Sequence, residues 1–256
     1  FMEGDSSEAR AHNDFADGVP YEAGAVQTCC SPMEPDDVDA PLIIEHNDIR
    51  GFPSRAEIDS EILEIKSNGA VVRYNLLEDN KGGISLRYSS HSQVYANRLV
   101  RSGGVNVRGS ENQVFSNVMV GSKIGITLSR WGRRQPGNCT TLPPTHRNVV
   151  AFNTILEPRD YGMRVGDCDY GACRPIEDNV FAYNIVSAGE GAVVAHYDDG
   201  DEAGRTTSCG SDSGGDADGG RNTGTVFVGN VFHAGAGATL GSAAAQDAAA
   251  SLDDPE

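Results

Sequence analysis

A lysine and an arginine, Lys66 and Arg87, stand 21 residues apart, each close to the end of a short apolar run. Lysine is rare in this chain, which has three lysines and 17 arginines. If the fold brings the two cations side by side, the like charge of Arg87 disfavours the protonated ammonium of Lys66. A neutral amine can abstract a weakly acidic proton, so this pair predicts base catalysis.

Two acidic residues, Asp59 and Glu61, lie just before Lys66. Carboxylate oxygens are hard ligands that suit calcium, especially when an asparagine carbonyl joins them. The competing interpretation is a row of solvated charges on an exposed sheet face. The spacing of Lys66 and Arg87, the rarity of lysine and the nearby acidic pair together favour a site.

Strand alternation decides which of these side chains share a face. Leu63 and Ile65 point to one side of a strand, so Glu64 and Lys66 point to the other. The run 84–88 repeats the pattern, with its aliphatic residues inward and Arg87 outward. Neighbouring strands of a sheet lie about 5 Å apart. A structure that repeats every 21 residues would therefore place Lys66 next to Arg87.

The element that supplies such a repeat is marked by a recurring asparagine between apolar residues. It occurs at Asn13, Asn47, Asn75, Asn97, Asn117, Asn153, Asn184 and Asn230. From Asn47 onward the steps are 28, 22, 20, 36, 31 and 46 residues. A shortest step of about 20–24 residues with longer ones between is typical of a solenoid with loop insertions. We therefore predict a single-stranded right-handed parallel β-helix, all-β, in which Asn75, Asn97 and Asn117 stack in one column.

The domain prediction is one β-helix over residues 1–233, with loops at 18–41, 130–147 and 198–224. The remaining residues, 234–256, are rich in Ala and Gly and then acidic. They are interpreted as a separate tail, either a short capping helix or a disordered end.

Composition narrows the possible partners. A formal charge of −17 argues against nucleic acid and anionic membranes, since both require a basic surface. An acidic substrate would need basic groups or a metal gathered locally. Six cysteines favour an oxidising location, secreted, extracellular or periplasmic, although they allow 15 pairings. We expect a monomer or a dimer.

At this point the residues resemble a known family. The stretch 61–68, then Tyr74-Asn75, then Gly83 to Tyr88 is similar to the family 6 polysaccharide lyases, which include alginate lyases and chondroitinase B. The pattern has two acids two residues apart, a lysine five residues after the second acid and an arginine 21 residues after the lysine. The similarity covers about residues 42–130.

The resemblance implies a parallel β-helix that cleaves a uronic-acid polymer, most simply alginate, by β-elimination. It implies that Asp59 and Glu61 bind Ca²⁺, with Asn13 as the third ligand and Asn47 as the alternative. It also implies that Lys66 is the base and Arg87 the acid or charge stabiliser.

Substrate contacts are expected from residues around this pair. Tyr88 stands where the family commonly has His, and Asn106 where alginate-cleaving members tend to have Arg. Arg108 shares a strand face with Asn106 and could replace that contact. Further candidates are His91, and Arg130 with Trp131, an aromatic platform beside a cation that would suit uronate carboxylates.

Three alternatives stay open on the same scaffold. A uronan C5-epimerase shares the proton abstraction, and a pectate- or dermatan-type lyase shares the elimination. A non-catalytic carbohydrate-binding β-helix would use Lys66 and Arg87 only to bind anionic sugar.

Overall fold

A computed structural model describes residues 42–52, 61–130, 145–168, 176–196 and 224–241, together with four two-residue strands before them. These four are β1 (Met2–Glu3), β2 (Phe15–Ala16), β3 (Val19–Pro20) and β4 (Val26–Gln27). The described residues are all β, and they contain no helix long and apolar enough to cross a membrane. The predicted Ca²⁺ ligands Asn13 and Asp59, and Trp131, lie outside the described residues.

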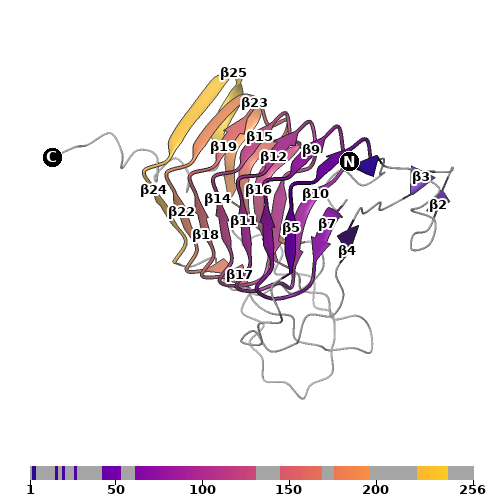
Figure 1. Cartoon of the computed structure of the whole chain (residues 1–256). Helices are drawn as coiled ribbons and strands as arrows, with labels where there is room; N and C mark the ends of the chain where they lie inside the picture. Colours follow the sequence, from indigo (N-terminus) through magenta and orange to yellow (C-terminus); the bar gives the residue numbers. More distant parts are fainter. Residues whose placement is uncertain are drawn as a thin grey trace.

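The strands stack as a parallel β-helix with three faces, which confirms the predicted fold (Figure 1). We name each face by its first complete strand. The β5 face contains β5 (Ile43–Glu45), β8 (Val71–Arg73), β11 (Gln93–Tyr95), β14 (Gln113–Phe115), β18 (Val149–Ala151), β22 (Val180–Ala182) and β24 (Val226–Val228). The β6 face contains β6 (Asp48–Arg50), β9 (Leu76–Glu78), β12 (Arg98–Val100), β15 (Val118–Val120) and β19 (Thr154–Leu156).

The β7 face contains β7 (Glu61–Ile65), β10 (Gly83–Arg87), β13 (Val105–Arg108), β16 (Ile124–Arg130) and β20 (Tyr161–Cys168). Two long strands, β23 (Ile185–His196) and β25 (Val231–Gly241), run from the β6 face onto the β7 face and join them into one sheet. A small parallel pair, β17 (Thr145–His146) and β21 (Ile176–Glu177), lies outside the three faces.

An asparagine ladder fixes the corner between the β5 and β6 faces. Nδ2 of Asn75 donates to Oδ1 of Asn97 at 2.9 Å, and Nδ2 of Asn97 donates to Oδ1 of Asn117 at 3.0 Å. The same bond links every rung from Asn47 to Asn230. A buried amide without partners is costly, so each ladder residue needs its neighbours in register. The prediction of one stacked column is confirmed.

The interior is aliphatic. Side chains that point inward from all three faces, such as Val72, Leu77 and Leu86, are fully buried. The long steps of the ladder arise where chain is inserted after β16, β20 and β23, which all end on the β7 face. Solenoids tolerate such insertions because the stacked strands keep their register.

Two element boundaries differ from those expected. Strands β3 and β4 fall within the stretch 18–41 expected to be a loop, and Val26 of β4 pairs with Leu63 of β7. Strand β25 continues to Gly241, past the boundary expected at 233, since small Ala and Gly residues can still pair along β23. No sequence periodicity marks either segment, because both are short of large apolar residues.

Candidate functional site

The β7 face brings Lys66 and Arg87 together as the 21-residue spacing predicts. Ile65 pairs with Leu86 across β7 and β10, so the next residues on each strand are also neighbours. Leu63 and Ile65 are fully buried in the core, which leaves Glu64 and Lys66 on the outer side. Lys66 has a side-chain exposure of 26% and Arg87 of 19%.

Two glutamates lie among these cations. Nη1 of Arg87 donates to Glu64 at 2.8 Å and to Glu61 at 3.0 Å. Nζ of Lys66 lies 2.8 Å from Glu64, and Oγ of Ser85 donates to Glu61 at 2.8 Å. Glu64 is a functional candidate that the sequence reasoning placed on the correct face but gave no role.

The carboxyl groups of Glu61 and Glu64 have pKa values shifted in opposite directions. Burial raises the pKa of Glu61 to about 7, although Arg87 beside it acts in the opposite direction. Burial also acts to raise the pKa of Glu64, but its hydrogen bonds with Lys66 and Glu61 and the charge of Arg87 lower it below the usual value. Near neutral pH the cluster therefore sets three cations, counting Arg108, against one ionised and one partly protonated carboxyl group.

Arg108 and Asn106 share a face, as expected from their spacing, and one hydroxyl joins them. Oγ of Ser129 donates to Oδ1 of Asn106 at 2.7 Å and accepts from Nε of Arg108 at 3.0 Å. Arg108 is buried, and its Nη1 lies 3.8 Å from Oε1 of Glu61. It therefore acts from beneath the surface, whereas Lys66 and Arg87 remain accessible.

A shallow open groove runs across the start of β10, β13 and β16. Its polar lining is Glu61, Ser85, Asn106, Thr127 and Lys123, and the rest consists of three glycines and three aliphatic residues. A Cβ on Gly83 would lie 2.0 Å from the carbonyl oxygen of Gly104. Only glycine fits such a close backbone approach. The glycine column keeps the floor of the groove free of side chains.

The other residues predicted to contact substrate or metal lie in different surroundings. Tyr88 is half-buried beside Arg87, whose guanidinium carbon lies 5.9 Å from the ring centroid, and burial raises the pKa of Tyr88. Only the backbone of Arg130 is described, at the end of β16. Asn47, the alternative Ca²⁺ ligand, is instead committed to the ladder through its bond to Asn75.

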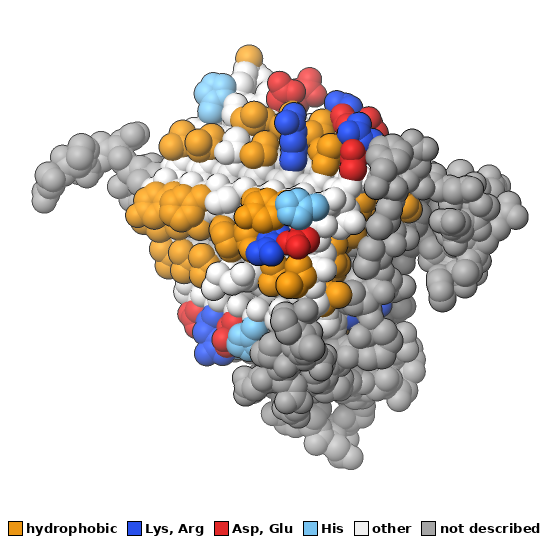
Figure 2. Space-filling view, in the orientation of Figure 1, with side chains coloured by type: hydrophobic (Ala, Val, Ile, Leu, Met, Phe, Trp, Pro, Cys, Tyr) orange, Lys and Arg blue, Asp and Glu red, His pale blue; other side chains and the backbone are white. Residues whose placement is uncertain are grey.

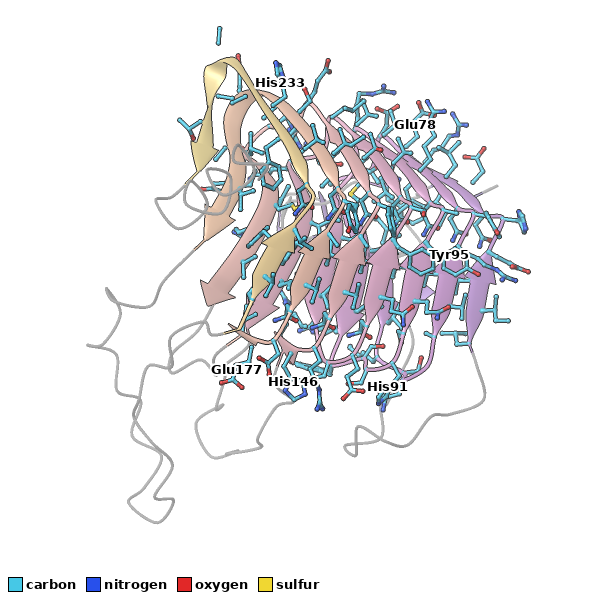
Figure 3. The ribbon with its side chains drawn as sticks, turned by 90° about the vertical axis from the view of Figure 1, so that its left-hand side faces the viewer. Glu78, His91, Tyr95, His146, Glu177 and His233 are labelled. Carbon is cyan, nitrogen blue, oxygen red and sulfur yellow. The ribbon has the colours of Figure 1, made fainter. Side chains whose placement is uncertain are left out.

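His91 belongs to a different group, at the corner between the β7 and β5 faces (Figure 3). Its Nδ1 lies 3.4 Å from Glu111, which also pairs with Arg147. His146 is next to Arg147, and burial together with that charge lowers the pKa of His146. The substrate-contact prediction for His91 thus receives no support from its contacts.

The described part of the expected calcium set does not fit a divalent cation. Both oxygens of Glu61 already accept hydrogen bonds, from Ser85 and Arg87, and Arg108 lies close by. A cation placed there would meet two guanidinium groups, which repel it. More widely, no group of three or more His, Cys, Asp or Glu side chains within the described ranges is arranged to hold a metal.

Comparison with known proteins gives one family. The family model described as periplasmic copper-binding protein (NosD) matches residues 43–208, more than half of the 256-residue chain. No curated protein and no solved structure matches the chain significantly. The match supports the parallel β-helix but not the family 6 lyases in particular. The periplasmic location in the family's description agrees with the location expected from the cysteines. The chain is a member of the NosD family of parallel β-helix proteins.

Proposed function

We propose that this protein is a polysaccharide lyase that cleaves a uronic-acid polymer, most simply alginate, by β-elimination on the β7 face. The observation that carries the proposal is the placement of Lys66 and Arg87 side by side, both partly accessible, on the face whose polar groove includes Glu61, the ion-pair partner of Arg87. The family match supports the scaffold on which this site lies.

Local charge favours an anionic polymer at this place. The chain as a whole carries −17, which repels polyanions. The cluster of Lys66, Arg87 and Arg108 reverses that sign locally, because its three cations face only two carboxyl groups, and the pKa of one of these, Glu61, is raised to about 7. Guanidinium groups bind carboxylates through paired hydrogen bonds, so a uronate carboxylate would dock against Arg87.

The reaction follows from these positions. Lys66, acting as the neutral amine, removes the proton from C5 of the uronate and becomes an ammonium. The C5–H electron pair forms the C4–C5 double bond, and the C4–O4 bond breaks. Water protonates the departing O4, since a guanidinium is a poor proton donor. Arg87 stabilises the negative charge that develops on the substrate carboxylate, and the buried positive charge of Arg108 near Glu61 acts in the same direction.

The proposed reaction uses no metal, because both carboxyl oxygens of Glu61 already accept hydrogen bonds from Ser85 and Arg87. In this proposal the guanidinium of Arg87 stabilises the substrate carboxylate, the role that a bound Ca²⁺ would otherwise have. Copper, which the family's description names, prefers imidazole and sulfur ligands. Clusters of that kind are absent from the described ranges, so these residues support no copper proposal.

A second candidate function is binding without catalysis. It is favoured by the ion pair between Lys66 and Glu64 at 2.8 Å, an arrangement that suits a lysine that binds anionic groups. A charged Lys66 can bind a carboxylate but cannot remove a proton.

The test is an ultraviolet assay for the 4,5-unsaturated product on alginate, polymannuronate, polyguluronate and dermatan sulfate. The proposal expects product from at least one polymer. Binding to a polymer with no product on any of them would favour the binding function. Exchange of the C5 proton with solvent, without product, would instead indicate an epimerase.

A further inference from the structure

The outward side chains of the β5 and β6 faces change from partly charged to uncharged part-way along the solenoid. The first and third residues of each three-residue strand point outward, since the middle residue points into the interior and is buried in every such strand except β24, where it is partly buried. On the first three rungs, half of these outward positions are charged: Glu45, Asp48, Arg50, Arg73, Glu78 and Arg98. From β14 and β15 onward, no outward position on either face is Asp, Glu, Lys or Arg.

We call these later outward positions, with Phe152 and Tyr183 on the corner between the faces, the uncharged patch. Large apolar side chains are exposed across it, among them Phe152 at 60%, Val231 at 59% and Tyr183 at 54%. Figure 2 shows apolar side chains grouped over β18, β22 and β24, with charged side chains toward the first rungs and below the group. A contiguous exposed surface of this kind marks an interaction site.

Ring geometry argues against a sugar on this patch. The rings of Phe152 and Tyr183 are stacked, with centroids 5.4 Å apart and planes within 10°. Their faces are therefore turned largely toward each other, whereas a pyranose packs on an open aromatic face. An anionic membrane is also disfavoured, because the chain carries −17 and the patch has neither Lys nor Arg. A protein surface is the remaining partner.

We propose that the uncharged patch is the surface through which two copies of this chain associate as a dimer. Two chains of charge −17 repel each other wherever acidic surfaces meet. In a two-fold contact the same patch faces itself, and an apolar surface without charge is complementary to itself. The patch extends over four rungs of two faces, close to the roughly 20 residues a side of a standard interface. The proposal is independent of the lyase proposal.

The chain provides a matched pair of variants. Tyr183 and Tyr74 both lie on the corner between the β5 and β6 faces, with backbone φ of 54° and 56° and exposures of 54% and 49%. Tyr183 lies within the uncharged patch, whereas Tyr74 lies beside the charged Arg73. Light scattering after size exclusion should give wild type and Tyr74→Glu twice the 27.0 kDa chain mass. Tyr183→Glu should give the monomer mass, since it places two carboxylates within an apolar interface.

Ile185→Glu, on the β6 side of the patch, provides a second variant should Tyr183→Glu fail to fold, and the same loss of dimer is expected. Circular dichroism identifies which variants are folded. A wild type that stays monomeric from micromolar to near-millimolar concentration would overturn the proposal. So would a dimer that both Tyr183→Glu and Ile185→Glu leave intact. Binding of a monomeric wild type to neutral phosphatidylcholine vesicles would assign the patch to a membrane surface instead.

Discussion

Lys66 and Arg87, from neighbouring rungs, both contact the same oxygen atom, Oε1 of Glu64, each at 2.8 Å. Glu64 therefore sets the distance between the two cations and partly neutralises both. This arrangement makes Glu64 the residue on which the proposed site depends most.

Removing the Glu64 charge should show how its ion pair with Lys66 affects catalysis. In Glu64→Gln the ion pair with Lys66 is lost, so the neutral amine becomes easier to form. We expect the pH at which lyase activity is half-maximal to fall relative to wild type. Measured pH profiles of kcat test this, and Glu78→Gln on the β6 face is the control. An unchanged profile would show that Glu64 does not govern Lys66.

Chelation tests the assignment of charge stabilisation to arginine. Because both oxygens of Glu61 are taken up by Ser85 and Arg87, activity should persist in excess EDTA. Inductively coupled plasma analysis of the chelated sample would confirm that metal is absent. Activity that is lost with EDTA and restored by added Ca²⁺ would instead support the ligand set Asn13, Asp59 and Glu61.

Stability should depend on pH through Glu61. Its pKa, about 7 in the folded chain, lies above its ordinary value, so the folded state holds the proton more tightly than the unfolded state. This contribution is fully present below about pH 4.5 and is lost as pH rises through about 7. We expect it to account for a fall of up to about 3 kcal/mol in the free energy of unfolding.

The Glu61→Gln variant isolates that effect, because an amide does not titrate. Urea unfolding from pH 5 to pH 8 should show a smaller downward slope in the variant than in wild type. The opposite contribution of Glu64, whose pKa is lowered, falls mainly below this window. Identical slopes in the two proteins would contradict the shift assigned to Glu61.

Substitutions in the asparagine ladder should lower the free energy of unfolding more than substitutions at exposed positions. Asn97→Ala removes the bonds to Asn75 and Asn117 and leaves buried polar atoms without partners. We expect a loss of about 2–4 kcal/mol in the free energy of unfolding. Gln93→Ala, on the same rung as Asn97 but partly exposed, should change it by less than about 0.5 kcal/mol. Equal midpoints in urea would show that the ladder bonds contribute little.

The solenoid repeat and the register that brings Lys66 next to Arg87 could both be predicted from the sequence. Both follow from short-range patterns: strand alternation and an asparagine that must find its neighbours. The second ladder, through Asn112, Asn148 and Asn179, was missed because polar or charged residues come directly before each of these asparagines, although apolar residues follow. Contacts that join different rungs, such as the Ser129 hydroxyl between Asn106 and Arg108, depend on side-chain geometry that spacing does not specify.

Lys123 is a related case. Its position in the sequence predicts an ordinary turn residue that tolerates Ala, as does that of Lys81. The structure instead places Lys123 in the lining of the groove, 3.8 Å from Asp160. Lys81 remains exposed and is therefore the proper control for a lysine substitution.

The most direct test of the central claim compares Lys66→Ala with Lys81→Ala at saturating uronan. If Lys66 is the base, its loss should lower kcat by about 10²- to 10⁴-fold with little change in polymer affinity, because the interaction exists only in the transition state. Lys81→Ala should match wild type. A Lys66→Ala protein that loses affinity but keeps its turnover at saturation would contradict the lyase mechanism.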